Sequence, residues 1–323
     1  MTPDFRIVAN GTDTTGKIAD RLISLELVDE DGLKADRMQL VLDDRDDAIE
    51  WPSLDAELEI SLGFKGRALT MIGRYAVDGI SGNGGACTMT ITAKAVDMKS
   101  DARAPRTRAW NGKKLSDIVR TIATEAGLTP VVSDSIASTG WAYLAQTAES
   151  NLHFLTRICA PLDATAKPAG GALVVQKRGE GKNAAGDGIT AVILSRARLS
   201  RWRWDLGSRD QYACVEAEWG DLDSGEQKTV TIGSGKPKRR LRHLYPNEAE
   251  ARRAAQGELD QGNRNALKLS AEVAGFEPAL FAGGTVTITD LRAELAGEWQ
   301  VTRVSHFLGA ALTTQFEARK ANS

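Results

Sequence analysis

A short residue pattern occurs once near each end of the chain, and it limits the possible folds more than any other feature. Residues 73–81 and 297–305 share Gly-x-aromatic-x-Val-x-x-β-branched-Ser, with a constant offset that carries Gly73 onto Gly297. Upstream, residues 58–60 resemble 286–288, and the strand after the pattern slips by about one residue in the second copy. One alternative is that amphipathic hairpins look alike because strands reuse threonine, valine and aromatic residues. We favour the other interpretation, in which one β module occurs twice.

The hydrophobic periodicity predicts strands on both sides of a helical segment. The first hundred residues alternate with period two, as in residues 22–28, where Ile23, Leu25 and Leu27 are expected to share one face. Between about 110 and 160 the period becomes 3.6, with an apolar stripe at Leu115, Ile118, Val119, Ile122, Ala123 and Ala126. A polar helix is expected near residues 247–261, and strands fill most of the remainder.

The predicted fold class is α+β, mainly β, with two related tube-like antiparallel β-barrels and a mixed α/β middle segment. We divide the chain into a first barrel (1–103), an α/β helical insert domain (104–165), a β-rich segment with exposed loops (166–240), and a polar helix with the second barrel (241–323). The second barrel is expected to be discontinuous and to include part of residues 166–240.

The composition is that of an ordinary globular protein with no strong charge. Hydrophobic residues make up 42% and charged residues 26% of the 323 residues, and the formal net charge is -2, so no overall field attracts nucleic acid or an anionic membrane. The sequence shows neither a membrane-spanning apolar segment nor a secretion signal, so we expect assembly in a cytoplasm. Cys87, Cys159 and Cys214 are few and widely spaced, and are predicted to be small buried apolar residues rather than disulfide partners or zinc ligands.

Residues that resemble a known family extend over nearly the whole chain. They are Trp51-Pro52, residues 56–64 and 73–78, Trp110 with the helix from Leu115, and above all residues 146–157 and 297–306. These segments resemble the phage late control D proteins, the contractile tail baseplate hub family of Mu-like and pyocin-like tails, which is similar to the N-terminal part of VgrG spike proteins. The family's usual Glu-Ser-Asp is Glu149-Ser150-Asn151 here, which still leaves a helix-capping residue.

The resemblance implies a virion structural protein, a baseplate hub of a contractile injection system. Its two barrels would let a homotrimer form a pseudo-sixfold ring, which adapts the hexameric tail tube to the trimeric spike. The implied partners are other copies of the chain, the tail tube protein, the spike or tail-tip protein and other baseplate proteins, with DNA only as passing cargo. Because the sequence stops at Ser323, the spike is expected to be a separate chain. The implied location is the tail baseplate of a virion that assembles in the host bacterial cytoplasm.

No group of residues has the spacing of a catalytic, cofactor-binding or metal site. His153, His243 and His306 lack a metal-ligand pattern, and we expect His153 at an interface and His306 in packing or a hydrogen bond. The loop at 179–183, Gly-Glu-Gly-Lys-Asn, lacks the Ser or Thr that a P-loop places after its lysine, so we interpret it as an exposed loop. The sequence therefore predicts no catalytic residue, no cofactor, no metal ligand and no enzymatic activity.

Two charged runs are the remaining candidates. The acidic run at 43–47 has the character of a solvated turn, and in a hub it could line a channel that does not retain DNA. The basic run from Lys236 to His243 is the one candidate for nucleic-acid contact. An exposed turn or strand edge, protected by charge or paired with acids on a neighbouring subunit, explains it better because no aromatic platform or recognition helix accompanies it. Two alternative functions stay open: a tail-tip cell-wall-degrading enzyme and, with less support, a nucleic-acid-binding regulator.

Overall fold

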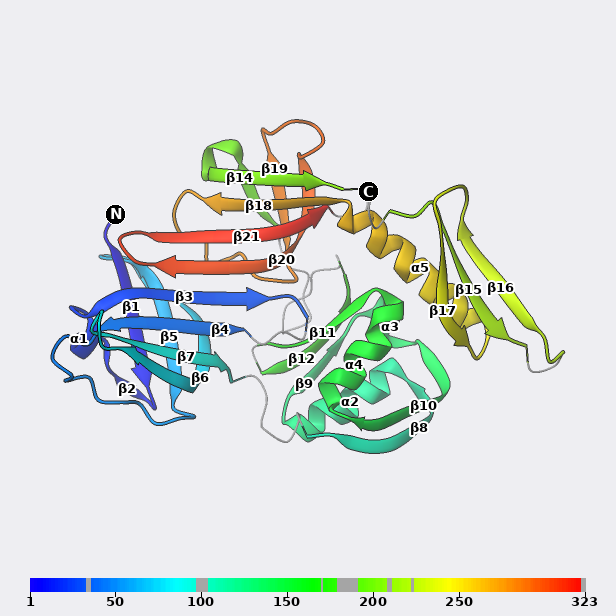
Figure 1. Ribbon diagram of the computed structural model, residues 1–323, viewed down its shortest axis with the longest axis horizontal. Helices are drawn as coiled ribbons and strands as arrows, with labels where there is room; N and C mark the ends of the chain where they lie inside the picture. The colour runs from blue at the N-terminus through cyan, green and yellow to red at the C-terminus, as the bar shows by residue number, and fades with distance from the viewer. Residues whose placement is uncertain are drawn as a thin grey trace.

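The computed structural model describes residues 1–32, 36–96, 104–169, 171–178, 191–207, 211–221 and 224–320. One 13-stranded sheet dominates these residues, and three small sheets accompany five α-helices. Figure 1 shows the large sheet on one side of the molecule and two smaller units beside it. The fold is thus a β-rich α+β fold, which confirms the predicted class.

The first module of the large sheet is a ladder of six strands. In hydrogen-bonding order they are β3 (Leu22–Glu30), β4 (Arg37–Asp43), β7 (Thr88–Ala95), β6 (Thr70–Asn83), β5 (Glu57–Phe64) and β1 (Pro3–Ala9). The short strand β2 (Thr12–Asp13) pairs with β1, and helix α1 (Thr15–Ile18) follows it. Alternate side chains of these strands, among them Leu25, Ile60 and Val77, form one buried core.

The second module repeats this order with later strands. They are β14 (Leu199–Leu206), β18 (Leu267–Val273), β21 (Leu312–Lys320), β20 (Gly297–Leu308), β19 (Thr285–Thr289) and β13 (Val192–Ser195). A 3₁₀ turn at Arg196–Arg198 separates β13 from β14. The core of this module contains Trp299, Val304 and Phe316. Each strand of the first module therefore has a counterpart at the same place in the ladder.

The strand registers confirm the repeat found in the sequence. Tyr75 lies opposite Leu58 across β5 and β6, and Trp299 lies opposite Val286 across β19 and β20. These are the residue pairs that the sequence alignment equates. Because a one-residue slip would turn every side chain to the other face of the sheet, a matching register shows equivalent cores.

The irregularities of the two ladders repeat as well. The pairing of β6 with β7 shifts between Val77 and Gly79, and the pairing of β20 with β21 shifts between Val301 and Arg303, which are the matching positions of the sequence repeat. Bulges of this kind locally re-aim side chains and increase strand twist. A shared bulge therefore shows that the two modules also bend at the same point.

The modules differ from the prediction because they are not two separate closed barrels. The C-terminal half of β20 pairs with β3, so the ladder runs without interruption from β14 to β2. The outermost strands also differ, since β1 is antiparallel to β5 whereas β13 is parallel to β19. At this joint, the edge hydrogen-bonding groups of β20 and β3 are therefore satisfied by the neighbouring module.

The middle of the chain forms a unit of two small sheets and three helices. Strands β8 (Arg106–Lys114) and β10 (Gly140–Glu149) form one sheet, and β11 (Ala164–Ala169), β12 (Ala172–Lys177) and β9 (Thr129–Val132) form the other. Helices α2 (Leu115–Ala126) and α4 (Asn151–Cys159) contact both sheets, and α3 (Asp134–Ala137) is short. The whole predicted stripe of α2 is buried, and Gly127 ends the helix with a left-handed φ of 70°.

A fourth unit lies at the right-hand edge of the molecule in Figure 1. Strand β15 (Cys214–Gly220) is flanked by β16 (Gln227–Gly233) and β17 (Lys238–Tyr245), and α5 (Glu248–Asn265) packs against them. Asn247 caps α5 by accepting a hydrogen bond from the Glu250 amide. Gly257 of α5 meets the 3₁₀ turn Ala160–Leu162 so closely that a Cβ there would lie 2.8 Å from the Pro161 carbonyl oxygen.

Candidate functional site

The joint between the two modules links the N-terminal and C-terminal parts of the chain. Residues 303–308 of β20 pair antiparallel with residues 25–30 of β3. Across this joint the Ser305 hydroxyl donates a hydrogen bond of 2.9 Å to Glu26, and Leu25 and Leu27 are almost completely buried. The joint therefore combines a backbone ladder with an apolar inner face.

A cluster of ion pairs attaches the middle unit to this joint. The Lys167 ammonium on β11 donates to the Asp29 carboxylate, to the Glu30 carbonyl oxygen at 2.9 Å and to Asp36 at 3.1 Å. Arg178 pairs with Asp31 in the same turn after β3. These groups lie beside a cavity of about 860 Å³ where the first module, the middle unit and the segment at 278–283 meet. Because these residues lie far apart in the chain, the cluster fixes the position of the middle unit relative to the sheet.

Burial changes the acid–base behaviour of this cluster. Burial, with a further contribution from the nearby Asp29, raises the pKa of Asp36 to about 7 in spite of the Lys167 ammonium. Burial alone would lower the pKa of Lys167, but Asp29 and Asp36 outweigh it, so the pKa of this lysine rises and the side chain stays charged. The arrangement stabilises one cation between two carboxylates and leaves Asp36 able to titrate near neutral pH.

His306 lies in the inner face of the module joint. Its Nδ1 is 3.0 Å from the Thr314 hydroxyl, and its ring packs edge-on against Phe276 at 5.2 Å between centroids. Burial lowers the pKa of His306 to about 4, so the ring is neutral at ordinary pH. The predicted packing and hydrogen bond are thus confirmed. His153 is exposed on α4, and His243 packs edge-on against Tyr245.

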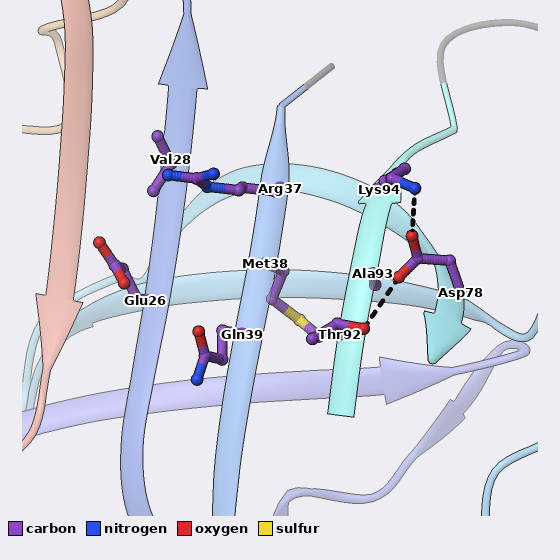
Figure 2. Close-up of a pocket in the computed structure, with 9 residues that line it drawn as sticks. All are labelled: Glu26, Val28, Arg37, Met38, Gln39, Asp78, Thr92, Ala93 and Lys94. Atoms are coloured by element: carbon purple, nitrogen blue, oxygen red, sulfur yellow. Dashed lines mark hydrogen bonds and ion pairs between the residues drawn. The ribbon is translucent and has the colours of Figure 1, made fainter. Parts of the chain in front are cut away.

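A second, shallow pocket of about 160 Å³ lies on the polar face of the first module, across β3, β4, β6 and β7. Figure 2 shows Glu26 on one side of this pocket and Asp78 on the other, with β4 and β7 between them. Asp78 pairs with Lys94 at 2.5 Å and accepts a hydrogen bond of 3.0 Å from Thr92. The hydrogen bond from Lys94 lowers the pKa of Asp78, so this carboxylate is ionised and suited to a structural ion pair rather than to proton donation.

The basic run forms most of β17, an edge strand of the small sheet. Lys238 pairs with Glu216 at 3.0 Å, Arg240 with Glu216 at 3.5 Å, and Arg239 with Glu258 of α5 at 3.0 Å. The run therefore lies on a strand edge, as one of the predicted alternatives had it, but its acidic partners here belong to the same chain and not to a neighbouring subunit. These internal pairs neutralise much of the charge that nucleic-acid binding would need.

The acidic run lies at the end of β4 and is also paired internally. Arg21 contacts both carboxylate oxygens of Asp46, at 2.6 and 2.7 Å, and the hydrogen bonds from Arg21 lower the pKa of Asp46 to about 2. Arg45 pairs with Asp43 at 3.1 Å. A channel-lining role for this run stays a prediction.

A partly buried polar network in the middle unit, with Gln146 and Asn151 at its buried end, was not expected from the sequence. Arg108 donates to Gln146 at 2.8 Å, to Asn151 at 2.8 Å and to Glu125 at 2.5 Å. Asn151 in turn donates to Glu125 at 3.0 Å. The helix cap is Ser150, whose hydroxyl accepts from the His153 amide, whereas Asn151 is 1% exposed and belongs to the network. The only sequence feature that could have pointed to this network is Asn151, which stands where the family pattern Glu-Ser-Asp has an aspartate.

Two of the three cysteines fulfil their prediction. Cys159 and Cys214 are buried, but Cys87 is exposed because it lies in the turn between β6 and β7 with a φ of 47°. The loop at 179–183 lies outside the described residues. Among the described residues, no group of three or more His, Cys, Asp or Glu side chains could hold a metal ion, and no helix is long and apolar enough to cross a membrane.

Comparison with known proteins identifies similar phage proteins over nearly the whole chain. The model of the phage tail baseplate hub (GPD) family matches residues 55–311. The probable baseplate hub proteins of Escherichia phages P2 and 186 are each 28% identical, with 98% of this chain and 93% and 92% of those proteins covered.

The solved structures that resemble this chain share its fold. The 43 kDa tail protein of prophage MuSo2 from Shewanella oneidensis has a TM-score of 0.73 at 15% identity, with 98% of each chain covered. The tail protein from Neisseria meningitidis MC58 has a TM-score of 0.70 at 12% identity, with 99% and 97% covered. The c3393 protein of E. coli, a type VI secretion component, has a TM-score of 0.55 at 11% identity, with 100% of this chain and 78% of that chain covered.

Proposed function

The chain belongs to the phage tail baseplate hub (GPD) family, and from this premise we infer that three copies form the ring that adapts a hexameric tail tube to a trimeric spike. Its role in the tail baseplate is structural. The single observation that carries the finer inference is the duplication of one six-stranded ladder, with the same order, registers and bulges. A trimer of such chains presents six similar modules on a threefold axis, and so matches a sixfold partner on one face and a threefold partner on the other.

The charged groups support a structural rather than a catalytic role. Asp78, Asp46 and Glu216 are all held in ion pairs with Lys or Arg, which keeps them ionised. The curated relatives are hub proteins as well. We therefore assign the chain no enzymatic activity, and place its assembly with tube, spike and other baseplate proteins in the host cytoplasm.

Co-expression with the tube and spike proteins of the same particle tests this function. The hub should co-purify with both proteins, and native mass spectrometry should give three hub copies for each spike trimer. Electron microscopy of the complex should show threefold symmetry at the hub and sixfold symmetry at the tube. A hub complex with two, four or six copies, or a hub that binds neither protein, would contradict the inference.

A further inference from the structure

The small sheet of the fourth unit has two free edges of different character. In its order β16-β15-β17, neither β16 nor β17 pairs with a further strand among the described residues. The register of β17 shifts where it passes Glu216 and Glu218 of β15, and five of its eight residues are Lys, Arg or His. Bulges and charges are the features that keep an edge strand from pairing with another chain. The β17 edge is therefore protected.

The edge of β16 has neither of these features. Its seven residues, Gln227–Gly233, pair with β15 in one uninterrupted register. The only charged residue of β16 is Lys228, which pairs with Asp221 and lies over the Trp219 ring of β15 at 5.6 Å. Most of the other residues are β-branched and favour strands. β16 thus presents a regular strand edge of about 24 Å without an unpaired charge.

The hairpin between β15 and β16 shows which backbone groups this edge exposes. The Asp221 amide donates to the Glu226 carbonyl oxygen at 2.9 Å, so these residues form a hydrogen-bonded pair. Such pairs alternate with open pairs along an antiparallel ladder. The amide and carbonyl groups of Gln227, Thr229 and Thr231 therefore point away from β15, toward the free edge.

We propose that the free edge of β16 is a docking site for an extended segment of another baseplate protein, which adds a fourth strand to the small sheet. The proposal uses the baseplate role of the chain and goes beyond the ring inferred above. Val230 is 5% exposed and, with Ile232, packs in the core against α5. Because this packing already orders β16, a partner strand binds at a lower entropic cost.

The side chains along β16 define the chemistry of the partner segment. On the face away from α5, Thr229 and Thr231 are exposed and favour threonine or serine across from them. On the face toward α5, the half-buried Ile232 favours an apolar residue. Glu226 is exposed and has no ion pair among the described residues, so it favours a lysine or arginine at that end. The partner segment should alternate small polar and apolar residues and carry a cation at one end.

A second copy of this chain fits the β16 edge less well. Two identical edges pair about a twofold axis, and such a contact closes at two copies rather than three. The other edge of the same sheet is protected by charge and by its bulge. In Figure 1, β16 lies at the right-hand boundary of the molecule, at the opposite end of the long axis from the first module. A different protein is therefore the better occupant.

Amide hydrogen exchange of the free hub and of the assembled baseplate tests the docking site. The outward amides of Thr229 and Thr231 should exchange rapidly in the free hub and about tenfold more slowly or less in the baseplate, since each gains a hydrogen bond. The inward amide of Val230 should be protected in both samples. In addition, Thr229→p-benzoylphenylalanine, irradiated in the assembled baseplate, should form an adduct with a chain other than the hub, identified by mass spectrometry.

Substitutions on the two edges separate docking from a general effect on the sheet. Thr231→Pro removes an outward amide and no bond to β15, and should lower the yield of the adduct about tenfold. Thr231→Lys keeps this amide but places a charge on the edge, and covers the case in which proline disturbs β16. The matched control is Leu244→Lys, which adds the same charge to the same face at the β17 edge and should leave the adduct unchanged.

Rapid exchange at Thr229 and Thr231 in the assembled baseplate would overturn the proposal, and so would an adduct that contains hub chains alone. An equal loss of adduct in Thr231→Lys and Leu244→Lys would also overturn it, because the added charge and not the edge would then be the cause. None of these results would change the copy number of the hub ring. A hub that enters no baseplate complex would instead contradict the proposed function.

Discussion

Replacement of Lys167 by methionine should destabilise the protein more at high pH than at low pH. Lys167 is the only cation that the described residues place between Asp29 and Asp36, with side chains 15%, 27% and 17% exposed, respectively. Methionine keeps most of the length of the lysine side chain but removes its charge and its three hydrogen-bond donors. The two carboxylates and the Glu30 carbonyl oxygen then lose their bonds to Lys167, and the carboxylates keep only neutral donors such as the Glu30 and Ala282 amides.

The expected magnitude follows from the titration of Asp36. Its pKa of about 7 lies above the usual 3.8, so the contribution of this group to stability is complete below about pH 4 and is lost as the pH rises through 7. Loss of Lys167 raises this pKa further, because an attractive charge disappears. At pH 8 the variant must keep an uncompensated buried carboxylate or hold it protonated, and we expect a loss of about 3 kcal/mol, the low end for a broken buried pair because this one is partly exposed.

At pH 5 the loss should be smaller. Asp36 is protonated in both proteins there, so no charge on Asp36 loses its counterion. The loss is confined to the interactions of Lys167 with Asp29, Glu30 and the neutral Asp36, which amounts to about 1–2 kcal/mol. The matched control is Lys94→Met, because Lys94 forms an exposed ion pair with Asp78 and its removal should cost at most about 1 kcal/mol at either pH.

Urea unfolding of the three proteins at pH 5 and pH 8, followed by circular dichroism and by fluorescence, measures these differences. If the unfolding transitions seen by circular dichroism and by fluorescence do not coincide, the units of the protein unfold separately. The comparison then uses the transition of the large sheet alone. An equal loss at both pH values, or a loss at pH 8 no larger than that of the control, would refute the role assigned to the buried cluster.

Three further changes test the buried polar groups. Asn151→Ala should lower the free energy of unfolding by about 2 kcal/mol at pH 7 in chemical denaturation, because Arg108, Gln146 and Glu125 each lose a hydrogen bond to this buried amide; an unchanged midpoint would contradict this. Ser150→Ala removes only the cap of the same helix and should cost about 1 kcal/mol at every pH, so it serves as the comparison. His306→Gln can retain the hydrogen bond to Thr314 without titrating. Because the pKa of His306 is depressed to about 4, the unmodified chain should lose stability as the pH falls from 6.5 toward 4. In thermal melts over this pH range, the variant should show a shallower loss of stability. Parallel pH profiles of the two proteins would exclude His306 as the cause.

Local patterns were sufficient to predict the three longer helices and the repeat, but not the four-residue helices α1 and α3. The six apolar positions of α2 recur every three or four residues, and all six are buried in the structure. The repeat was visible because residues that determine strand register, such as Tyr75 and Trp299, face the core in both modules and are restricted to large apolar side chains.

Strand irregularities and long-range pairs were not predictable in the same way. Ile23 was expected to share a face with Leu25 and Leu27, but it is 47% exposed because the register shift between Leu22 and Ser24 breaks the alternation. Nothing in the local sequence marks that shift. The Lys167 cluster joins residues more than a hundred positions apart, so its members appear in the sequence as ordinary isolated charges.

The differences between the two modules are as informative as their similarity. The joint within the chain sets His306 of β20 opposite Leu27 of β3, whereas the position of β6 that matches His306 in the repeat is Gly82. A glycine in place of His306 would leave a cavity beside Leu27, so the two modules cannot exchange edges without a loss of packing. One repeated backbone ladder therefore carries two different sets of edge side chains. In the proposed trimer, the ladders would present six similar modules while the side chains keep threefold symmetry.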